Sequence, residues 1–403
     1  MKINAAHLTY CTNIHPAENW PETFWALKNH FPAIRAALAG KEQMGIGLRL
    51  SNMASLGLLA EEDNLAEFKQ WLSDHDAYVF TMNGFPYGGF HNTVVKDEVH
   101  APDWTTVERV DYTLRLFRIL GELLPEGLQG GISTSPLSYK PWHAAGEARN
   151  TARAIATENI LTVMAALFKI HRSAGVLMHL DIEPEPDGFL ESGREFIDWF
   201  ENDLLPRGIL LLGEQFGLSP ADAEEAVKQH INLCYDVCHF AIGYEEHESV
   251  IDELAAKGIQ VGKIQISAAL KAHLPVDLAM RDEVTDALAR FNEPTYLHQV
   301  IAKTAKGELI RYPDLPEALA DNQNPAVNEW RAHFHVPVFV EDMGVVQSTQ
   351  NDIVRVLNKF RNIAFTQHLE VETYTWSVLP DELKASLTQS IIRELDWVKA
   401  QIS

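Results

Sequence analysis

The sequence predicts one (β/α)8 barrel that spans all 403 residues. Short β-like runs alternate with longer segments of helical period from one end of the chain to the other, which is typical of parallel strands joined by crossover helices. About eight such units follow one another, and no composition shift, low-complexity run or repeat divides them. Eight strand-helix pairs favour a closed barrel, although an open doubly wound sheet remains an alternative.

The predicted strands are short runs rich in aliphatic and aromatic residues, bounded by turn-forming residues. They are His7–Asn13, Gly45–Ser51, Ala77–Asn83, Gly130–Ser135, Val176–Glu183, Ile231–Asp236, Gln260–Ser267 and His368–Thr373. Between them, Asn150–Ala174 is the clearest amphipathic helix, because apolar residues recur there at helical spacing and Gly175 follows as a stop signal. A final helix is expected at Asp381–Ile402.

One region breaks the alternation after the seventh strand. A helical stretch is expected after Ser267, and β-like runs then follow at Tyr296–Ile301, Glu308–Tyr312 and His333–Val340. The first two runs flank Lys306–Gly307, which predicts a β-hairpin. An isolated two-stranded hairpin is marginal in water, so it must rest on something. We expect an insertion at about residues 268–332 that covers the catalytic face, shielding the pocket or contacting another subunit of a homo-oligomer.

Charge and cysteine content narrow the possible partners. Against 33 Lys and Arg stand 56 Asp and Glu, a net charge of -23, which argues against nucleic acid and anionic lipid. The three cysteines, Cys11, Cys234 and Cys238, form no plausible disulfide framework and suit a reducing compartment. The first residues lack the features of a signal peptide, and no apolar run approaches the length of a membrane span. A cytoplasmic protein with a small-molecule partner is therefore expected.

The segment MHLDIEPEP carries an unusual row of polar side chains. If the strand continues that far, His179, Asp181, Glu183 and Glu185 share one face at period two. Three carboxylates on one face repel each other unless a cation, a basic side chain or shared protons compensate them. The alternative is that Glu183 and Glu185 lie in a solvated loop broken by Pro184 and Pro186.

Other strands carry polar groups at the same end. These are Asp236 with His239 in CYDVCH, Gln265 in KIQIS, His333 and His335 in HFHVPVF, and Glu372 in HLEVETYTW. Gln265 is as well explained by a hydrogen-bonded barrel residue as by a ligand, and a histidine pair satisfied by backbone carbonyls is nearly as good an interpretation of HFH. Oxygen ligands suit Mg²⁺ or Mn²⁺ and His with carboxylates suits Zn²⁺, so a divalent metal of open identity is predicted.

Further polar residues at this end are candidates for substrate binding. They are Tyr10, Arg49, Asn83, His91, Lys96 and His239. The stretch Asn83–Trp104 is rich in Gly, Pro and aromatic residues and is expected to form a second loop over the catalytic face. Aromatic rings beside polar groups suit a sugar or cyclitol, but such loops also serve as plain lids. For Arg49, a structural pairing with a carboxylate is favoured over substrate binding.

The order of these residues resembles the xylose isomerase-like TIM barrels, and among them the ketose epimerases: Glu after strand five, Asp-x-x-His after strand six, a polar residue on strand seven and Glu after strand eight. The resemblance implies metal ligands at Glu183, Asp236, Gln265 and Glu372. It also implies that Glu183 and Glu372 form the acid-base pair and that His239 contacts substrate. The family usually has His where this chain has Gln265. Either His335 supplies the missing imidazole, or the metal is lost.

Several longer segments are similar to the EboE-type metabolite-traffic proteins, a branch of the same superfamily. They are HLTYCTNIHP, NGFPYGGFH, STSPLSYKP, DIEPEPDGFLE, YDVCHFA, HFHVPVF and VETYTW. That branch is associated with gene clusters thought to make or move a prenylated or polyol-like secondary metabolite. Two functions are therefore expected: a metal-dependent isomerase or epimerase of a sugar, polyol or related metabolite, or a non-catalytic metabolite-binding protein. An endonuclease fits poorly, because the chain is strongly acidic.

Overall fold

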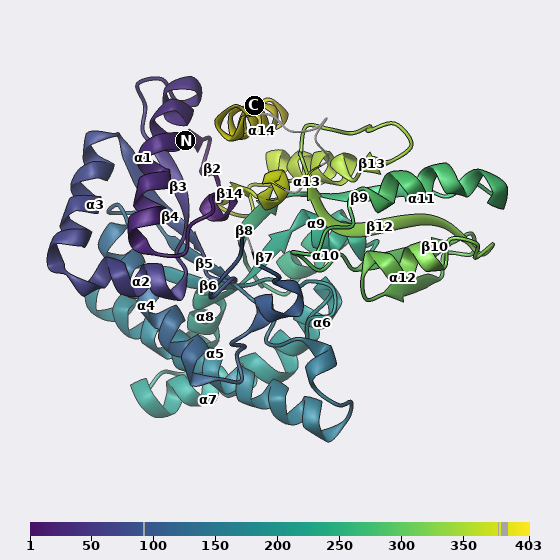
Figure 1. Ribbon diagram of the computed structural model, residues 1–403. Helices are drawn as coiled ribbons and strands as arrows, with labels where there is room; N and C mark the ends of the chain where they lie inside the picture. Colours follow the sequence, from purple (N-terminus) through teal and green to yellow (C-terminus); the bar gives the residue numbers. More distant parts are fainter. Residues whose placement is uncertain (92, 378, 380–385) are drawn as a thin grey trace.

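A ring of parallel strands surrounded by helices forms the body of the molecule (Figure 1). The computed structural model describes residues 1–91, 93–377, 379 and 386–403. A nine-stranded sheet has the order β1-β2-β14-β8-β7-β6-β5-β4-β3, in which β1 is antiparallel to β2 and the other neighbours are parallel. Its strands are β1 Lys2–Ile3, β2 Ala6–Tyr10, β3 Met44–Arg49, β4 Ala77–Asn83, β5 Gly130–Thr134, β6 Met178–Ile182, β7 Ile231–Asp236, β8 Val261–Ile266 and β14 His368–Val371.

The barrel closes between β3, at one end of this strand order, and β2, which is next to the short end strand β1. Cys11 and Gly47 form a parallel bridge there. The Thr9 hydroxyl donates to the Gly45 carbonyl at 2.9 Å and accepts from the Gly47 N–H at 3.0 Å. The sequence prediction of a barrel is therefore confirmed, and the open doubly wound sheet is wrong. Closure depends on a side-chain hydroxyl as well as on backbone pairing.

Each of the eight predicted strands is present, but several end earlier than predicted. β2 ends at Tyr10 because Thr12–Ile14 turns into a short 3-10 helix. β6 ends at Ile182, so Glu183 begins the loop that follows it. The polar residues of the candidate site thus lie at or just beyond the carboxyl ends of the strands, which is where catalytic groups of such barrels gather.

Helices cover the outside of the barrel. They are α1 Trp20–Leu38, α2 Asn52–Ala60, α3 Glu62–Asp74, α4 Val107–Leu123, α5 Glu147–Ala174, α6 Gly193–Trp199, α7 Leu205–Phe216, α8 Pro220–His230, α9 Val237–Ile242, α10 His247–Ala256, α13 Gln350–Asn362 and α14 Leu387–Ile402. The predicted final helix is present from Leu387, and its first part, residues 381–385, lies outside the described residues. α1 and α14 pack together, which brings the two ends of the chain to one side (Figure 1).

Helix α5 has the length and apolar composition of a membrane-crossing helix. It packs against α4, α7, α8 and β6 as one helix of the outer layer. Its buried side chains include Ile160, Val163 and Leu167, the helical stripe recognised in the sequence, and Gly175 ends it with φ 72°. An apolar stripe that faces a barrel is sufficient to explain this composition.

The inside of the barrel is polar along its whole length. Near the amino ends of the strands, His7 Nδ1 lies 2.6 Å from the Tyr78 hydroxyl and His179 Nδ1 lies 2.6 Å from Asp181. At mid-height Lys263 and Glu370 form an ion pair. Aliphatic residues on the opposite faces of the strands pack against the helices. The apolar core therefore lies mainly between the strands and the helices, and polar pairs fill the centre.

A second sheet follows β8 after the single residue Ser267. This insertion sheet has the order β11-β10-β12-β9-β13 and is antiparallel throughout. Its strands are β9 Ala268–His273, β10 Val300–Thr304, β11 Leu309–Tyr312, β12 Val327–Val336 and β13 Gln347–Ser348, with α11 Arg281–Ala289 and α12 Leu315–Ala320 beside them. Figure 1 shows it projecting from one side of the barrel.

The structure corrects one prediction for this region and confirms the hairpin. The stretch directly after Ser267 is strand β9, because it pairs with β12 and β13, and the helix expected before Tyr296 follows later as α11. The predicted hairpin exists as β10 and β11, with Gly307 in its turn at φ 84°, but β10 also pairs with β12. It is thus part of a larger sheet rather than an isolated hairpin. Tyr296 and Leu297 precede β10 and line the cavity described next.

Candidate functional site

A cavity opens at the carboxyl ends of the barrel strands, between the barrel, the Asn83–Trp104 loop and the insertion. Its empty volume is about 590 Å³, part of which is open to solvent. The polar residues that line it include Asn13, Asn83, Lys96, His100, Glu183, Glu185, His239, Gln299, His333, His335 and Glu372, and the rings of Phe85, Phe90, Tyr296 and Tyr374 border them. The predicted placement of loop and insertion over this face is confirmed by these linings.

Three carboxylates converge at the floor of the cavity: Glu183 and Glu372 line it, and Asp236 lies directly beside them. Glu183, Asp236 and Glu372 are each no more than 4% exposed, and each offers an oxygen within 4.8 Å of the others. Among the residues that the structure describes, Glu183 Oε2 and Asp236 Oδ2 have no hydrogen-bond partner. Burial, and then the neighbouring negative charges, hold the pKa of Glu183 and of Glu372 well above the usual range. Such a cluster is stable only with protons or a cation.

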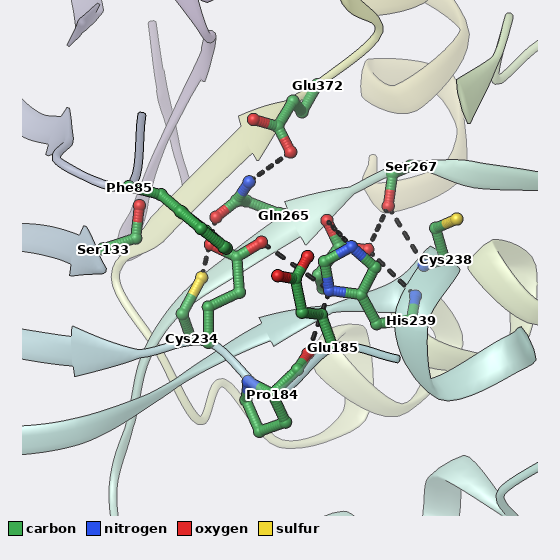
Figure 2. Close-up of polar contacts among 12 residues, drawn as sticks. Phe85, Ser133, Pro184, Glu185, Cys234, Cys238, His239, Gln265, Ser267 and Glu372 are labelled. Atoms are coloured by element: carbon green, nitrogen blue, oxygen red, sulfur yellow. Dashed lines mark hydrogen bonds and ion pairs between the residues drawn. The ribbon is translucent and has the colours of Figure 1, made fainter. Parts of the chain in front are cut away.

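Glu372 is held in place by three amide groups. Asn13 Nδ2 and Asn83 Nδ2 donate to Glu372 Oε1 at 2.7 and 2.9 Å, and Gln265 Nε2 donates to Glu372 Oε2. The Gln265 oxygen in turn accepts from the Cys234 thiol at 2.8 Å, as Figure 2 shows. In this geometry Gln265 presents a donor to the site and orients Glu372.

The DVCH segment is organised by a helix cap. Asp236 ends β7 and caps α9, so that its Oδ1 accepts from the backbone N–H of His239 at 3.2 Å. The Ser267 hydroxyl donates to the same oxygen at 2.6 Å (Figure 2). The cap places His239 one turn along the helix, beside the carboxylates. Its ring lies 3.7 Å from Glu183 and 3.9 Å from Asp236.

Two histidines of β12 face the same cavity from the insertion, as their spacing in HFH predicted. His333 Nε2 lies 3.1 Å from His239 Nε2, and His333 Nδ1 lies 2.9 Å from Gln299 Oε1. His335 Nδ1 lies 3.0 Å from the Glu372 carbonyl oxygen, and His335 Nε2 has no partner. Burial lowers the pKa of His335 to about 4 and that of His333 well below its ordinary value. Both rings are therefore neutral near pH 7.

Four overlapping groups of side chains have the spacing of metal ligands. They are Glu183, Asp236 and Glu372; Asp236, His239 and His335; Glu185, His239 and His333; and Cys238, His333 and His335. All of these residues are buried. The unpartnered atoms of Glu183, Asp236 and His335 fit a cation, because carboxylate oxygens and neutral imidazole nitrogens are the donors that divalent metals use.

Of the residues proposed for substrate binding, Asn83, Lys96 and His239 line the cavity. The Lys96 ammonium group is paired with Asp314 at 2.7 Å. His91 lies one layer away, where its Nδ1 is 3.1 Å from the Tyr296 hydroxyl.

Tyr10 and Arg49 point elsewhere. The Tyr10 hydroxyl lies 3.2 Å from His15 Nε2 on the outer face of β2, because the inward side chains of that strand are His7 and Thr9. Arg49 donates to the Ala17 carbonyl at 2.9 Å and pairs with Glu18 at 3.3 Å, so the structural role favoured for it agrees with its contacts.

Several residues that reach the cavity were not singled out in the sequence. His100 Nε2 lies 3.0 Å from Glu185 Oε1, and Gln299 and Tyr296 come from the segment before β10. The only sequence signal for His100 is its place in a loop expected over this face. For Gln299 the signal was similar, since it lies in the insertion expected over this face, but its contact with His333 depends on how the insertion sheet folds back over the barrel.

No protein-family model matches the sequence, and no curated protein matches it. Solved structures match along the whole chain. A xylose isomerase-like TIM barrel protein from Mycobacterium smegmatis in complex with magnesium has 10% identity and a TM-score of 0.50, with 100% of this chain and 98% of that chain covered. The probable 3-DHS dehydratase AsbF of Bacillus anthracis has 11% identity, a TM-score of 0.47 and 97% of both chains covered. A D-tagatose 3-epimerase-like protein has 9% identity, a TM-score of 0.47, and 98% and 97% covered.

At such identities the likeness concerns the fold and not the reaction. The closed ring of mainly parallel strands agrees with it. The chain has the fold of the xylose isomerase-like TIM barrels.

Proposed function

We propose that this protein is a metal-dependent isomerase or epimerase of a sugar, polyol or related small metabolite, and that it works by proton transfer between carboxylates and a carbon next to a carbonyl group. One observation carries the proposal: Glu183, Asp236 and Glu372 converge, buried, at the floor of a cavity. Isolated carboxylates are costly to bury, so a fold that gathers three of them requires a cation or protons there.

Glu183, Asp236 and Glu372 would hold a divalent cation, and His335 offers a further nitrogen close to Asp236. When bound, such an ion supplies Lewis-acid stabilisation of negative charge that develops on a substrate oxygen. Mg²⁺, Mn²⁺ and Zn²⁺ are each compatible with these donors. Gln265 is a supporting residue in this proposal, since its oxygen is taken by Cys234 and its nitrogen holds Glu372.

The two glutamates have different surroundings, which suits a pair with opposite tasks. Glu183 Oε2 is unpartnered and borders the cavity, so Glu183 is placed to remove a proton from carbon. Glu372 is fixed from both sides by amide donors and is placed to return a proton. Phe85, Phe90 and Tyr296 at the rim exclude water and offer apolar surface to a carbon skeleton.

The second candidate is a binding or traffic protein that retains the pocket without turnover. One observation favours it: both carboxylate oxygens of Glu372 already accept hydrogen bonds from amide groups. A carboxylate in this state has less capacity to act as a base. The resemblance to EboE-type proteins is in keeping with this candidate.

Exchange of carbon-bound hydrogen with solvent deuterium separates the two candidates. Purified protein would be analysed for metal and for co-purifying small molecules, and then incubated in heavy water with those molecules and with a panel of ketoses. The enzyme proposal predicts deuterium next to the carbonyl group, lost in Glu183→Gln and in Glu372→Gln. Glu308→Gln, in the exposed turn of the insertion, is the matched control. Full exchange by Glu372→Gln would remove that residue from the mechanism, and tight binding without exchange would favour the second candidate.

A further inference from the structure

The rings of His239 and His333 face each other, and the question is which of their ring nitrogens carry protons. Their Nε2 atoms lie 3.1 Å apart, and both side chains are buried. A hydrogen bond across this gap requires one of the two Nε2 atoms to carry a proton. The partners of the Nδ1 atoms decide whether either does.

On His239, Nδ1 lies 2.9 Å from the carbonyl oxygen of Pro184, which can only accept. The proton of the neutral ring is therefore on Nδ1, and Nε2 carries a lone pair. Figure 2 shows Pro184 below the His239 ring.

On His333, Nδ1 lies 2.9 Å from Gln299 Oε1. The orientation of this amide is fixed from its other end, because Gln299 Nε2 donates to the Pro186 carbonyl at 3.2 Å. Nδ1 of His333 therefore carries the ring proton as well, and two lone pairs face each other across 3.1 Å. Two such lone pairs repel unless a proton or a metal ion lies between them.

Glu185 completes the arrangement. One of its oxygens lies within 4.8 Å of ligand nitrogens of His239 and His333, and the side chain is only 5% exposed. Its Oε1 has no hydrogen-bond donor, although His100 Nε2 approaches to 3.0 Å. The site thus offers two imidazole nitrogens and a carboxylate oxygen, and all three side chains border the cavity.

We infer that His239, His333 and Glu185 form a second metal position, one that takes a borderline divalent ion such as Zn²⁺, beside the carboxylate floor. Two nitrogens bound to tetrahedral zinc at ~2.05 Å lie about 3.3 Å apart, close to the spacing found here. The donors differ from those of Glu183, Asp236 and Glu372, whose oxygen-only set suits harder ions. With three protein ligands, a fourth position faces the cavity and is open to water or a substrate oxygen.

The outer contacts of this position have the form typical of zinc sites. Each ligating histidine donates its other ring N–H to a carbonyl oxygen, which fixes the tautomer and the ring plane. Half of the position comes from the barrel, through Glu185 and His239, and half from the insertion, through His333 and its partner Gln299. Bound zinc would therefore join the insertion sheet to the barrel.

The test is a zinc titration of metal-free protein, followed by X-ray absorption at the zinc edge. His333→Asn should remove one class of zinc site, and Gln299→Leu, which loses only the outer hydrogen bond, should weaken that class by roughly 10- to 100-fold. His230→Asn is the matched control, because His230 is buried with Nδ1 2.7 Å from the Met178 carbonyl and Nε2 unpartnered among the described residues. The His171 ring meets it edge-on at 5.6 Å between centroids, but His230 belongs to none of the groups with metal-ligand spacing. His230→Asn should leave zinc binding unchanged.

The Glu372→Gln variant should still bind zinc at this position although it lacks a residue of the proposed reaction. The second metal position and the proposed reaction can therefore fail independently. X-ray absorption of the wild-type protein and of Glu372→Gln, each loaded with zinc at this position, should show two imidazole ligands. Zinc surrounded by oxygen alone, or a His333→Asn protein that binds zinc as tightly and in the same amount as wild type, would overturn the inference. The spectrum of the wild-type protein tests the inference by itself, even if a variant folds poorly.

Discussion

The ammonium group of Lys263 lies 2.5 Å from the Glu370 carboxylate, and both side chains are fully buried at mid-height in the barrel. Lys263 also donates to the Met82 carbonyl at 3.0 Å. Burial disfavours the charged amine, but Glu370 outweighs this and raises the pKa of Lys263 above its ordinary value. The Lys263–Glu370 pair lies between the polar groups at the amino ends of the strands and the carboxylates of the candidate site at their carboxyl ends.

Lys263→Met should destabilise the protein by about 3–5 kcal/mol, because it leaves Glu370 buried without its counter-charge. The double variant Lys263→Met with Glu370→Leu should recover most of this loss, since it removes both charges. Urea denaturation of the two variants and the wild type measures the difference. A double variant that is no more stable than the single one would show that the uncompensated charge of Glu370 does not cause the loss.

Gly47→Ala should destabilise the barrel by about 1–3 kcal/mol or more through overpacking. A Cβ at this position would lie 2.0 Å from Glu370 Oε1 and 2.7 Å from the Tyr10 carbonyl oxygen, and neither can retreat easily. Gly88→Ala is the control, because a Cβ there meets nothing within 4 Å. Equal thermal stability of the two variants would contradict this account of the barrel interior.

His335→Ala should lose more bound metal than Gln265→Ala. His335 Nε2 is buried and unpartnered beside Asp236 and His239, whereas the Gln265 oxygen is already engaged by Cys234. Elemental analysis of both variants, purified without added metal, measures the effect. If His335→Ala keeps its metal while Gln265→Ala loses it, the ordinary strand-seven position holds the ligand after all.

Glu394 of α14 should make the protein less stable as the pH rises. Burial raises its pKa from 4.5 to about 7, despite hydrogen bonds from the Thr373 hydroxyl at 2.7 Å and the Val338 N–H at 3.2 Å. The folded state therefore keeps a proton that the unfolded state releases. This contribution is complete below pH 4.5 and is lost as the pH rises to about 7.

Glu394→Gln should remove that loss. Relative to wild type, the variant should gain up to about 3 kcal/mol of unfolding free energy at pH 8 compared with pH 5. Chemical denaturation at the two pH values measures it, with the exposed Glu308→Gln as control. A difference between variant and wild type that does not change with pH would show that Glu394 ionises normally.

Much of the fold was predictable because barrel strands are short, regularly spaced and buried. β9 was not, since AALKAH favours a helix by composition and becomes a strand only through pairing with β12 and β13. The register of β2 was available in principle. Alternation places His7 and Thr9 inward, so Tyr10 had to face the helices.

The carboxylates of the site were predictable because Glu183, Asp236 and Glu372 end successive buried segments with polar groups. Their surroundings were not. That Glu185 is buried rather than solvated depends on His100, 85 residues earlier in the chain, and on the insertion, which begins 83 residues later. Single-sequence patterns describe one element at a time, and this part of the site is made by contacts between elements.

The position of β14 in the barrel also has a consequence for biosynthesis. This strand pairs with both β2 and β8, and Glu372 follows it directly. During translation the earlier strands are made first, but the ring stays open until the last tenth of the chain has left the ribosome. A truncated product lacks one of the three floor carboxylates. The proposed metal position would therefore be complete only in a chain that has been translated past β14.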